Sequence, residues 1–125
     1  SETSDIFTQD YIDGILSEDD SVEQWTCYLK ENSLTRTKIP FAGVAPTFIV
    51  TAEKDDLAIA APVHADIPVL CEQGYAIQHR QCKDAGHVDG ALDSLKEQYD
   101  WLLARLNGED MTNICEVQEA LPCND

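Results

Sequence analysis

The sequence has few basic residues and no long apolar segment. Eight Lys and Arg side chains stand against 24 Asp and Glu in 125 residues, which gives a formal net charge of −16. This charge excludes a nucleic-acid binder held by phosphates, and it argues against docking on an anionic membrane surface. No run approaches the ~18 apolar residues of a membrane-spanning helix, so no membrane span is predicted.

The sequence also lacks any Cys-x-x-Cys pair, although it contains five cysteines. Zinc knuckles and thioredoxin-type redox motifs need that spacing, so neither is expected. His64, His87, Asp55 and Asp56 lack any compact ligand spacing, so we predict no metal site, and we predict no cofactor. Disulfides in a secreted protein explain the cysteine density more simply, and the odd number leaves at least one cysteine free or paired with another chain. Cys115 and Cys123 lie in a polar tail that a disulfide to the body, or within the tail, would stabilise. The pairing stays open at this point.

The first part of the chain has the pattern of two short helices. Hydrophobic residues make up 43% and charged residues 26% of the sequence, which is typical of one small globular domain. Apolar residues recur at helical spacing over residues 5–17. A second helix, opened by a capping-box pattern at Asp20 and Glu23, is predicted to end near Asn32. Residues 33–46 are predicted to form a loop.

The second part alternates between strand and helix patterns. Residues 47–51 form a continuous β-branched and aromatic run, which is typical of a strand buried on both faces. A helix over residues 63–71 follows, then a strand over residues 75–82 whose clearer alternation favours a place nearer a sheet edge. A leucine stripe predicts a last helix over residues 92–106. This order predicts an α/β fold with parallel strands joined by helical crossovers.

Two parallel strands do not make an independent sheet, so further strands are expected from elsewhere. We therefore interpret the chain as the C-terminal part of a larger α/β fold that is separated from its N-terminal half.

Two side chains that can transfer protons follow these strands. In open α/β sheets, reactive groups gather at the carboxyl ends of the strands. Asp55 lies a few residues after the first strand, and His87 lies in the turn after the second. A carboxylate can hold one imidazole N–H there, which leaves the other nitrogen to accept a proton from a nucleophile. Asp56 is a rival for the role of Asp55.

The residues around these positions resemble the end of an α/β-hydrolase. Residues 46–57 look like the late strand and acid turn of that family, although Ala52 stands where glycine is usual. Residues 70–77 are similar to its helix end, glycine and last strand, and residues 85–87 to its Gly-His motif. Residues 95–108 are similar to its closing helix. The cysteines look most like those of secreted lipases and esterases.

The resemblance implies three segments and a set of roles. Residues 1–45 would form a helical cap- or lid-like segment with its loop, residues 46–108 the C-terminal part of the hydrolase core, and residues 109–125 a cysteine-bearing tail. Asp55 would orient His87, the general base and acid of a Ser-His-Asp triad.

The same resemblance implies a missing nucleophile and a substrate pocket. The chain contains no G-x-S-x-G, so the nucleophilic serine is expected in the N-terminal half of the enzyme, as a separate chain. Trp25 and Leu29 are candidates to line an acyl pocket, although simple packing is the favoured role of their stripe.

The sequence thus predicts a secreted carboxylic ester hydrolase that acts on a small-molecule ester. One alternative is a serine peptidase of the same fold. The other is a non-catalytic, acidic binding domain stapled by disulfides, which would fold without a partner chain.

Overall fold

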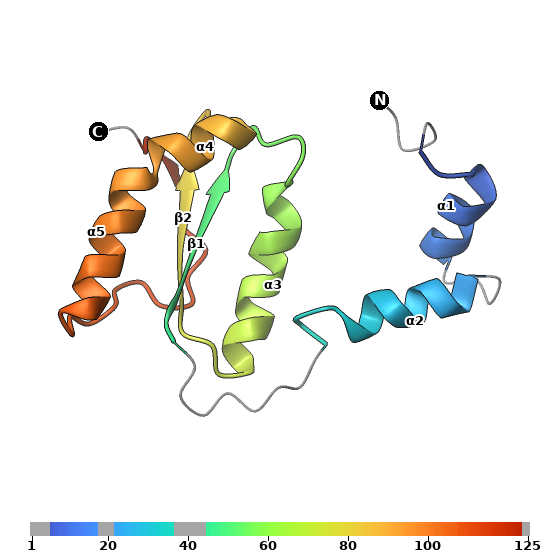
Figure 1. Cartoon of the computed structure of the whole chain (residues 1–125), viewed down its shortest axis with the longest axis horizontal. Helices are drawn as coiled ribbons and strands as arrows, with labels where there is room; N and C mark the ends of the chain where they lie inside the picture. The colour runs from blue at the N-terminus through green and yellow to red at the C-terminus, as the bar shows by residue number, and fades with distance from the viewer. Residues whose placement is uncertain (1–5, 18–21, 37–44, 124–125) are drawn as a thin grey trace. The chain divides into compact units, whose positions relative to one another are not determined.

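The chain is described from a computed structural model, which covers residues 6–17, 22–36 and 45–123. It divides into two compact units, Ser1–Ile39 and Pro40–Asp125 (Figure 1). Within the described ranges, no helix is long and apolar enough to cross a membrane.

The first unit contains the helices α1 (Gln9–Ser17) and α2 (Glu23–Glu31). The helix α1 begins at Gln9 and not at the predicted residue 5. Thr8 caps this start, because its Oγ1 accepts the Tyr11 N–H at 3.3 Å. The N-cap of α2 is Val22, which offers no side-chain cap. Asp20, the predicted capping residue, lies outside the described residues.

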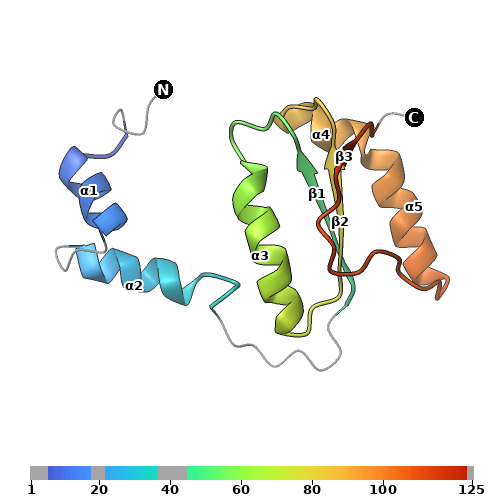
Figure 2. The same ribbon diagram turned by 180° about the vertical axis from the view of Figure 1, so that it is seen from behind.

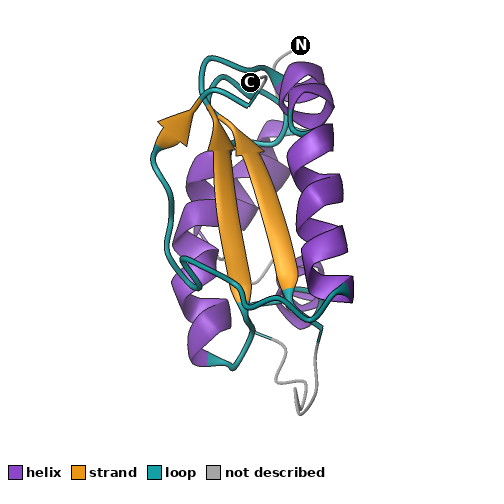
Figure 3. Cartoon of the chain, turned by 90° about the vertical axis from the view of Figure 1, so that its left-hand side faces the viewer, coloured by secondary structure: helices purple, strands orange, loops and turns teal. Residues whose placement is uncertain are grey.

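The second unit is built on a parallel sheet, as predicted. Strands β1 (Thr47–Ala52), β2 (Ile77–Cys82) and β3 (Ala120–Leu121) lie in the order β1-β2-β3, and both pairings are parallel (Figure 3). The register of the long pair runs from Thr47↔Ile77 to Ala52↔Cys82. The third strand comes from the tail and was not predicted. It places β2 in the centre of the sheet, so the expected edge position of that strand is wrong.

Helices cover both faces of the sheet (Figures 1 and 2). On one face lies α3 (Ala60–Glu72), whose Ile67 and Leu70 form a buried cluster with Ile77 of β2. The helix keeps Pro68 in its interior, and Gly74 follows its end at a φ of +101° that favours glycine. On the other face lie α4 (His87–Asp93) and α5 (Leu95–Leu106).

The break between α4 and α5 corrects the single helix predicted over residues 92–106. Ser94 lies at the break and is fully buried. Its Oγ donates to the Gly90 carbonyl at 2.6 Å and accepts from Nε2 of Gln98 at 2.7 Å. Since this hydroxyl occupies a carbonyl of the preceding turn, it competes with the backbone hydrogen bond that would continue the helix.

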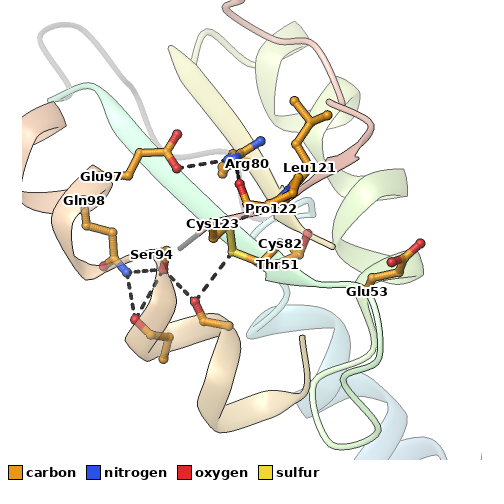
Figure 4. The surroundings of a disulfide bond; sticks show 12 residues. Thr51, Glu53, Arg80, Cys82, Ser94, Glu97, Gln98, Leu121, Pro122 and Cys123 are labelled. Carbon is orange, nitrogen blue, oxygen red and sulfur yellow. Dashed lines mark hydrogen bonds and ion pairs between the residues drawn. A yellow bond between two sulfur atoms is a disulfide. The ribbon is translucent and has the colours of Figure 1, made fainter. Parts of the chain in front are cut away.

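Two disulfides tie the tail to the body, which is one of the two arrangements predicted. Cys71 of α3 pairs with Cys115, and Cys82 of β2 pairs with Cys123. Figure 4 shows the second disulfide and, beside it, Arg80, which bonds both Glu97 of α5 at 3.0 Å and the carbonyl of Pro122. The remaining cysteine, Cys27, is free and exposed.

Part of the apolar surface of the sheet and of α5 is not covered by any described residue. β1 is an edge strand of the described sheet, and its residues are only half-buried apart from Thr51 and Ala52. The predicted burial on both faces is therefore incomplete within the chain itself. Along α5, the leucine stripe lies at the surface, with Leu95 57% and Leu106 74% exposed.

Candidate active site

The loops that follow β1 and β2 are joined by hydrogen bonds at the carboxyl end of the sheet. The Glu53 N–H donates to the Cys82 carbonyl at 3.0 Å, and the Lys54 N–H donates to the Ala85 carbonyl at 2.9 Å. The Asp84 N–H donates to Oε2 of Glu53 at 2.8 Å. These bonds extend the parallel pairing beyond the strands, so the side chains that follow are held at a fixed separation.

Asp55 is held by the backbone of its own turn. Its Oδ1 accepts the N–H groups of Ala58 at 2.8 Å and Leu57 at 2.9 Å, and its side chain is 8% exposed. The Ala58 N–H lowers the pKa of Asp55 the most, against the opposing effect of desolvation, and the hydrogen bond from His87 lowers it further. The carboxylate is therefore fixed in place and ionised at neutral pH.

His87 lies against this carboxylate. Its Nδ1 is 2.9 Å from Oδ2 and 3.2 Å from Oδ1 of Asp55. An ionised carboxylate can only accept hydrogen bonds, so Nδ1 carries the proton and Nε2 of the neutral ring is an acceptor. The ring is 50% exposed, and no described residue bonds Nε2. Both carboxylate contacts of His87 are to Asp55, and neither is to its rival Asp56.

The position of His87 is set by a helix start rather than by the open turn predicted. Gly86 is the N-cap of α4, with an extended backbone at φ −87° and ψ −173°, and His87 is the first residue of the helix. The Gly90 N–H closes the first turn by donating to the Gly86 carbonyl at 2.8 Å. The first turn of α4 therefore holds the backbone of His87 in place.

The predicted pocket residues lie elsewhere in the chain. Trp25 and Leu29 are four residues apart on α2, share one side of that helix and are each 58% exposed. Both belong to the first unit and the Asp–His pair to the second. Of the predicted site residues, the structure therefore brings together Asp55 and His87.

A second polar cluster lies under the tail and was not predicted. His79 of β2 is 2% exposed, and its Nδ1 accepts the Gln118 N–H at 3.1 Å. Its proton is therefore on Nε2, which donates to Oγ1 of Thr51 at 2.9 Å. The Thr51 hydroxyl can then donate to Nε2 of His64, 3.3 Å away.

This cluster keeps a histidine neutral inside the fold. Burial lowers the pKa of His79 to about 4, and the nearby His64 contributes a smaller part of the shift. The four residues come from β1, α3, β2 and the tail, so no local sequence pattern could have found them. The sequence assigned His64 to a helix and His79 to a strand, and no functional role was predicted for either.

No protein-family model, curated protein or solved structure matches this chain with significant similarity. Within the described ranges, no group of three or more His, Cys, Asp or Glu side chains could hold a metal ion. The chemistry that the described site can perform is proton transfer. An oriented imidazole with one exposed nitrogen can take a proton from a nearby hydroxyl and return it to a leaving group.

Proposed function

We propose that this chain is the C-terminal part of a serine hydrolase of the α/β-hydrolase type that cleaves carboxylic esters. The observation that carries the proposal is the 2.9 Å bond between Nδ1 of His87 and Asp55 at the ends of adjacent parallel strands. In this proposal Asp55 orients and stabilises the imidazolium, and His87 is the general base and acid. The nucleophilic serine lies in the N-terminal half of the enzyme, present as a separate polypeptide.

The exposed apolar surface supports a second polypeptide. β1 presents an edge of six residues, Thr47–Ala52, without proline or charge, and such an edge is open to pairing with a further strand. Beside it Phe48 stacks on Trp101 with ring centroids 5.4 Å apart, next to the exposed leucine stripe of α5. Large apolar patches of this kind mark interaction sites on folded proteins.

The proposed reaction proceeds through an acyl-enzyme. Nε2 of His87 accepts the proton of the serine hydroxyl as the serine oxygen attacks the ester carbonyl. When the tetrahedral intermediate collapses, the protonated Nε2 returns this proton to the leaving alcohol. Water then repeats the sequence against the acyl-enzyme and releases the carboxylic acid. The Asp55 carboxylate stays ionised throughout, which its lowered pKa favours.

Two further roles belong to the proposal. Trp25 and Leu29 of α2 are the proposed acyl-binding side chains, since both are apolar and exposed on that helix. The protein is secreted, which agrees with the Cys71–Cys115 and Cys82–Cys123 disulfides, because such bonds persist in oxidising compartments.

A fluorophosphonate probe tests the proposal. The native preparation is analysed by intact mass before and after exposure to the probe. We expect a second, non-identical chain to co-purify and to take one adduct, and His87→Ala to abolish labelling. The 125-residue chain alone, folded and unlabelled, would contradict the proposal and favour a non-catalytic binding domain.

Neighbouring acids provide the matched control. Asp55→Asn should slow labelling by about 10⁴-fold, because an amide can no longer hold the required imidazole tautomer. Asp56→Asn removes the same charge from the next residue, which has no bond to His87, and should leave the rate near that of the parent. Equal effects of the two variants would attribute the loss to charge and not to the triad geometry.

A further inference from the structure

The helix that carries His87 packs unusually closely on the end of β1. A Cβ atom added at Gly90 would lie 2.6 Å from the Cβ of Ala52. Non-bonded carbon atoms normally approach to about 3.5–4.0 Å, so no side chain fits at this position while the Ala52 methyl group is present. Ala52 is 4% exposed and belongs to the buried cluster with Cys82 and Ala85, so it has little room to move.

This contact joins the two segments that carry the Asp–His pair. His87 lies three residues before Gly90 in α4, and residues three apart share one side of a helix. Asp55 lies three residues after Ala52, in a turn closed by the Asp55 N–H on the Ala52 carbonyl at 3.3 Å. The helix and the turn therefore meet twice, once at the Ala52–Gly90 contact and once at the Asp55–His87 hydrogen bond.

We propose that the Ala52–Gly90 contact sets the distance between His87 and Asp55, and that Gly90 is a positioning residue for this pair. Glycine at this place lets α4 approach the strand end closely enough for the 2.9 Å hydrogen bond to form. A methyl group at position 90 would force the helix and the strand end apart by about 1 Å to reach normal contact. The role in catalysis rests on the proposed function, whereas the effect on the hydrogen bond does not.

The first variant of the test is Gly90→Ala, studied in the protein as purified, together with any chain that accompanies it. The expected result is loss of the downfield proton NMR signal of the His87 Nδ1–H, which reports its bond to Asp55. Fluorophosphonate labelling should slow by about 10²-fold, as for other displacements of this size in active sites. Alanine has the higher helix propensity, so weakening of α4 cannot explain such a loss.

The second variant exchanges alanine and glycine between positions 52 and 90, so that only one methyl group lies at the contact. In Ala52→Gly/Gly90→Ala, the new Cβ would meet the Cα of residue 52 at 3.6 Å and the Cβ of Ala85 at 3.9 Å, both ordinary contacts. We expect this exchange to restore the His87 signal and most of the labelling rate. The matched control is Ala91→Gly, which removes an exposed methyl group from the neighbouring position of α4 and should leave the signal in place.

The outcomes separate this inference from the proposed function. An unchanged His87 signal in Gly90→Ala, a failure of the exchange to restore it, or an equal loss in Ala91→Gly would each overturn the positioning role. If the signal follows the expected pattern but the parent protein takes no probe, the positioning role stands and the hydrolase proposal fails.

Discussion

The buried ring of His79 predicts that the fold loses stability as the pH falls from 6.5 toward 4. The ring is 2% exposed, and its Nδ1 accepts the backbone N–H of Gln118. A proton added to Nδ1 would face that N–H, so the charged ring must give up a hydrogen bond and remain desolvated. The native state therefore resists a proton that the unfolded chain binds readily.

The size of the effect follows from the pKa of His79, which burial and, to a smaller extent, His64 lower from 6.5 to about 4. Below pH 6.5 the unfolded state binds more protons than the native state, so stability falls with pH until the native ring also titrates near pH 4. The gap corresponds to at most ~3.4 kcal/mol. The full gap develops only below pH 4, so a comparison between about pH 6.5 and pH 4.5 captures about 2 kcal/mol of it.

Urea unfolding followed by circular dichroism, with the disulfides intact, measures this loss. The free energy of unfolding is compared between about pH 6.5 and pH 4.5. In this range the carboxylates whose pKa is lowered in the fold, such as Asp55 and Asp84, are still ionised. Glutamine cannot gain a charge in this range, so His79→Gln should lose less stability than the parent protein in acid. At neutral pH, this variant should be the less stable of the two. His64→Gln, the matched control, should keep most of the acid loss.

An equal acid loss in the parent protein and in His79→Gln would refute this reasoning. A ring resonance of His79 that titrates near its ordinary value of 6.5 in the folded protein would refute it as well.

Three further predictions concern the fold. Gly74→Ala places a methyl group at a φ of +101° and should lower the free energy of unfolding by about 1–3 kcal/mol, measured with urea; no change would show that the loop relaxes. Thiol titration of the denatured, unreduced protein should find one thiol, that of Cys27, and none in Cys27→Ser; a second thiol would contradict the observed pairs. Gln78→Leu deprives the Trp101 indole N–H of its partner at 3.0 Å and should lower the free energy of unfolding by about 1–3 kcal/mol. An unchanged urea midpoint would contradict this expectation.

Local patterns predicted the main elements of the second unit, because each has a signal within its own residues. A β-branched run marks β1, a helical period ending before glycine marks α3, and alternation marks β2. β3 has no such signal: Ala120 and Leu121 are two residues of a polar tail. Their pairing with β2 accompanies the Cys82–Cys123 disulfide, and such a long-range link leaves no periodic trace in the sequence.

The division of the last helix was missed for a different reason. The leucine spacing is continuous from Leu92 into α5, so periodicity alone favours one helix. The break depends on the buried hydroxyl of Ser94, which bonds the carbonyl of Gly90. A serine in a helical pattern is usually a solvated residue, and its burial can be known only once α4 has been packed against β1.

The Asp–His pair could be predicted because parallel topology fixes where strands end. Strands joined by a helical crossover present their carboxyl ends at one edge, so an acid after one strand and a histidine after the next are neighbours before any side chain is placed. The sequence could not choose between Asp55 and Asp56 in physical terms, because both acids follow the same strand. The choice is made by the backbone of the turn: the N–H groups of Leu57 and Ala58 hold the carboxylate of Asp55. An aspartate at the first position of such a turn can accept the N–H groups of the residues two and three positions further along the chain, as Asp55 does. Asp56 lies one residue too late in the chain to accept both of these N–H groups.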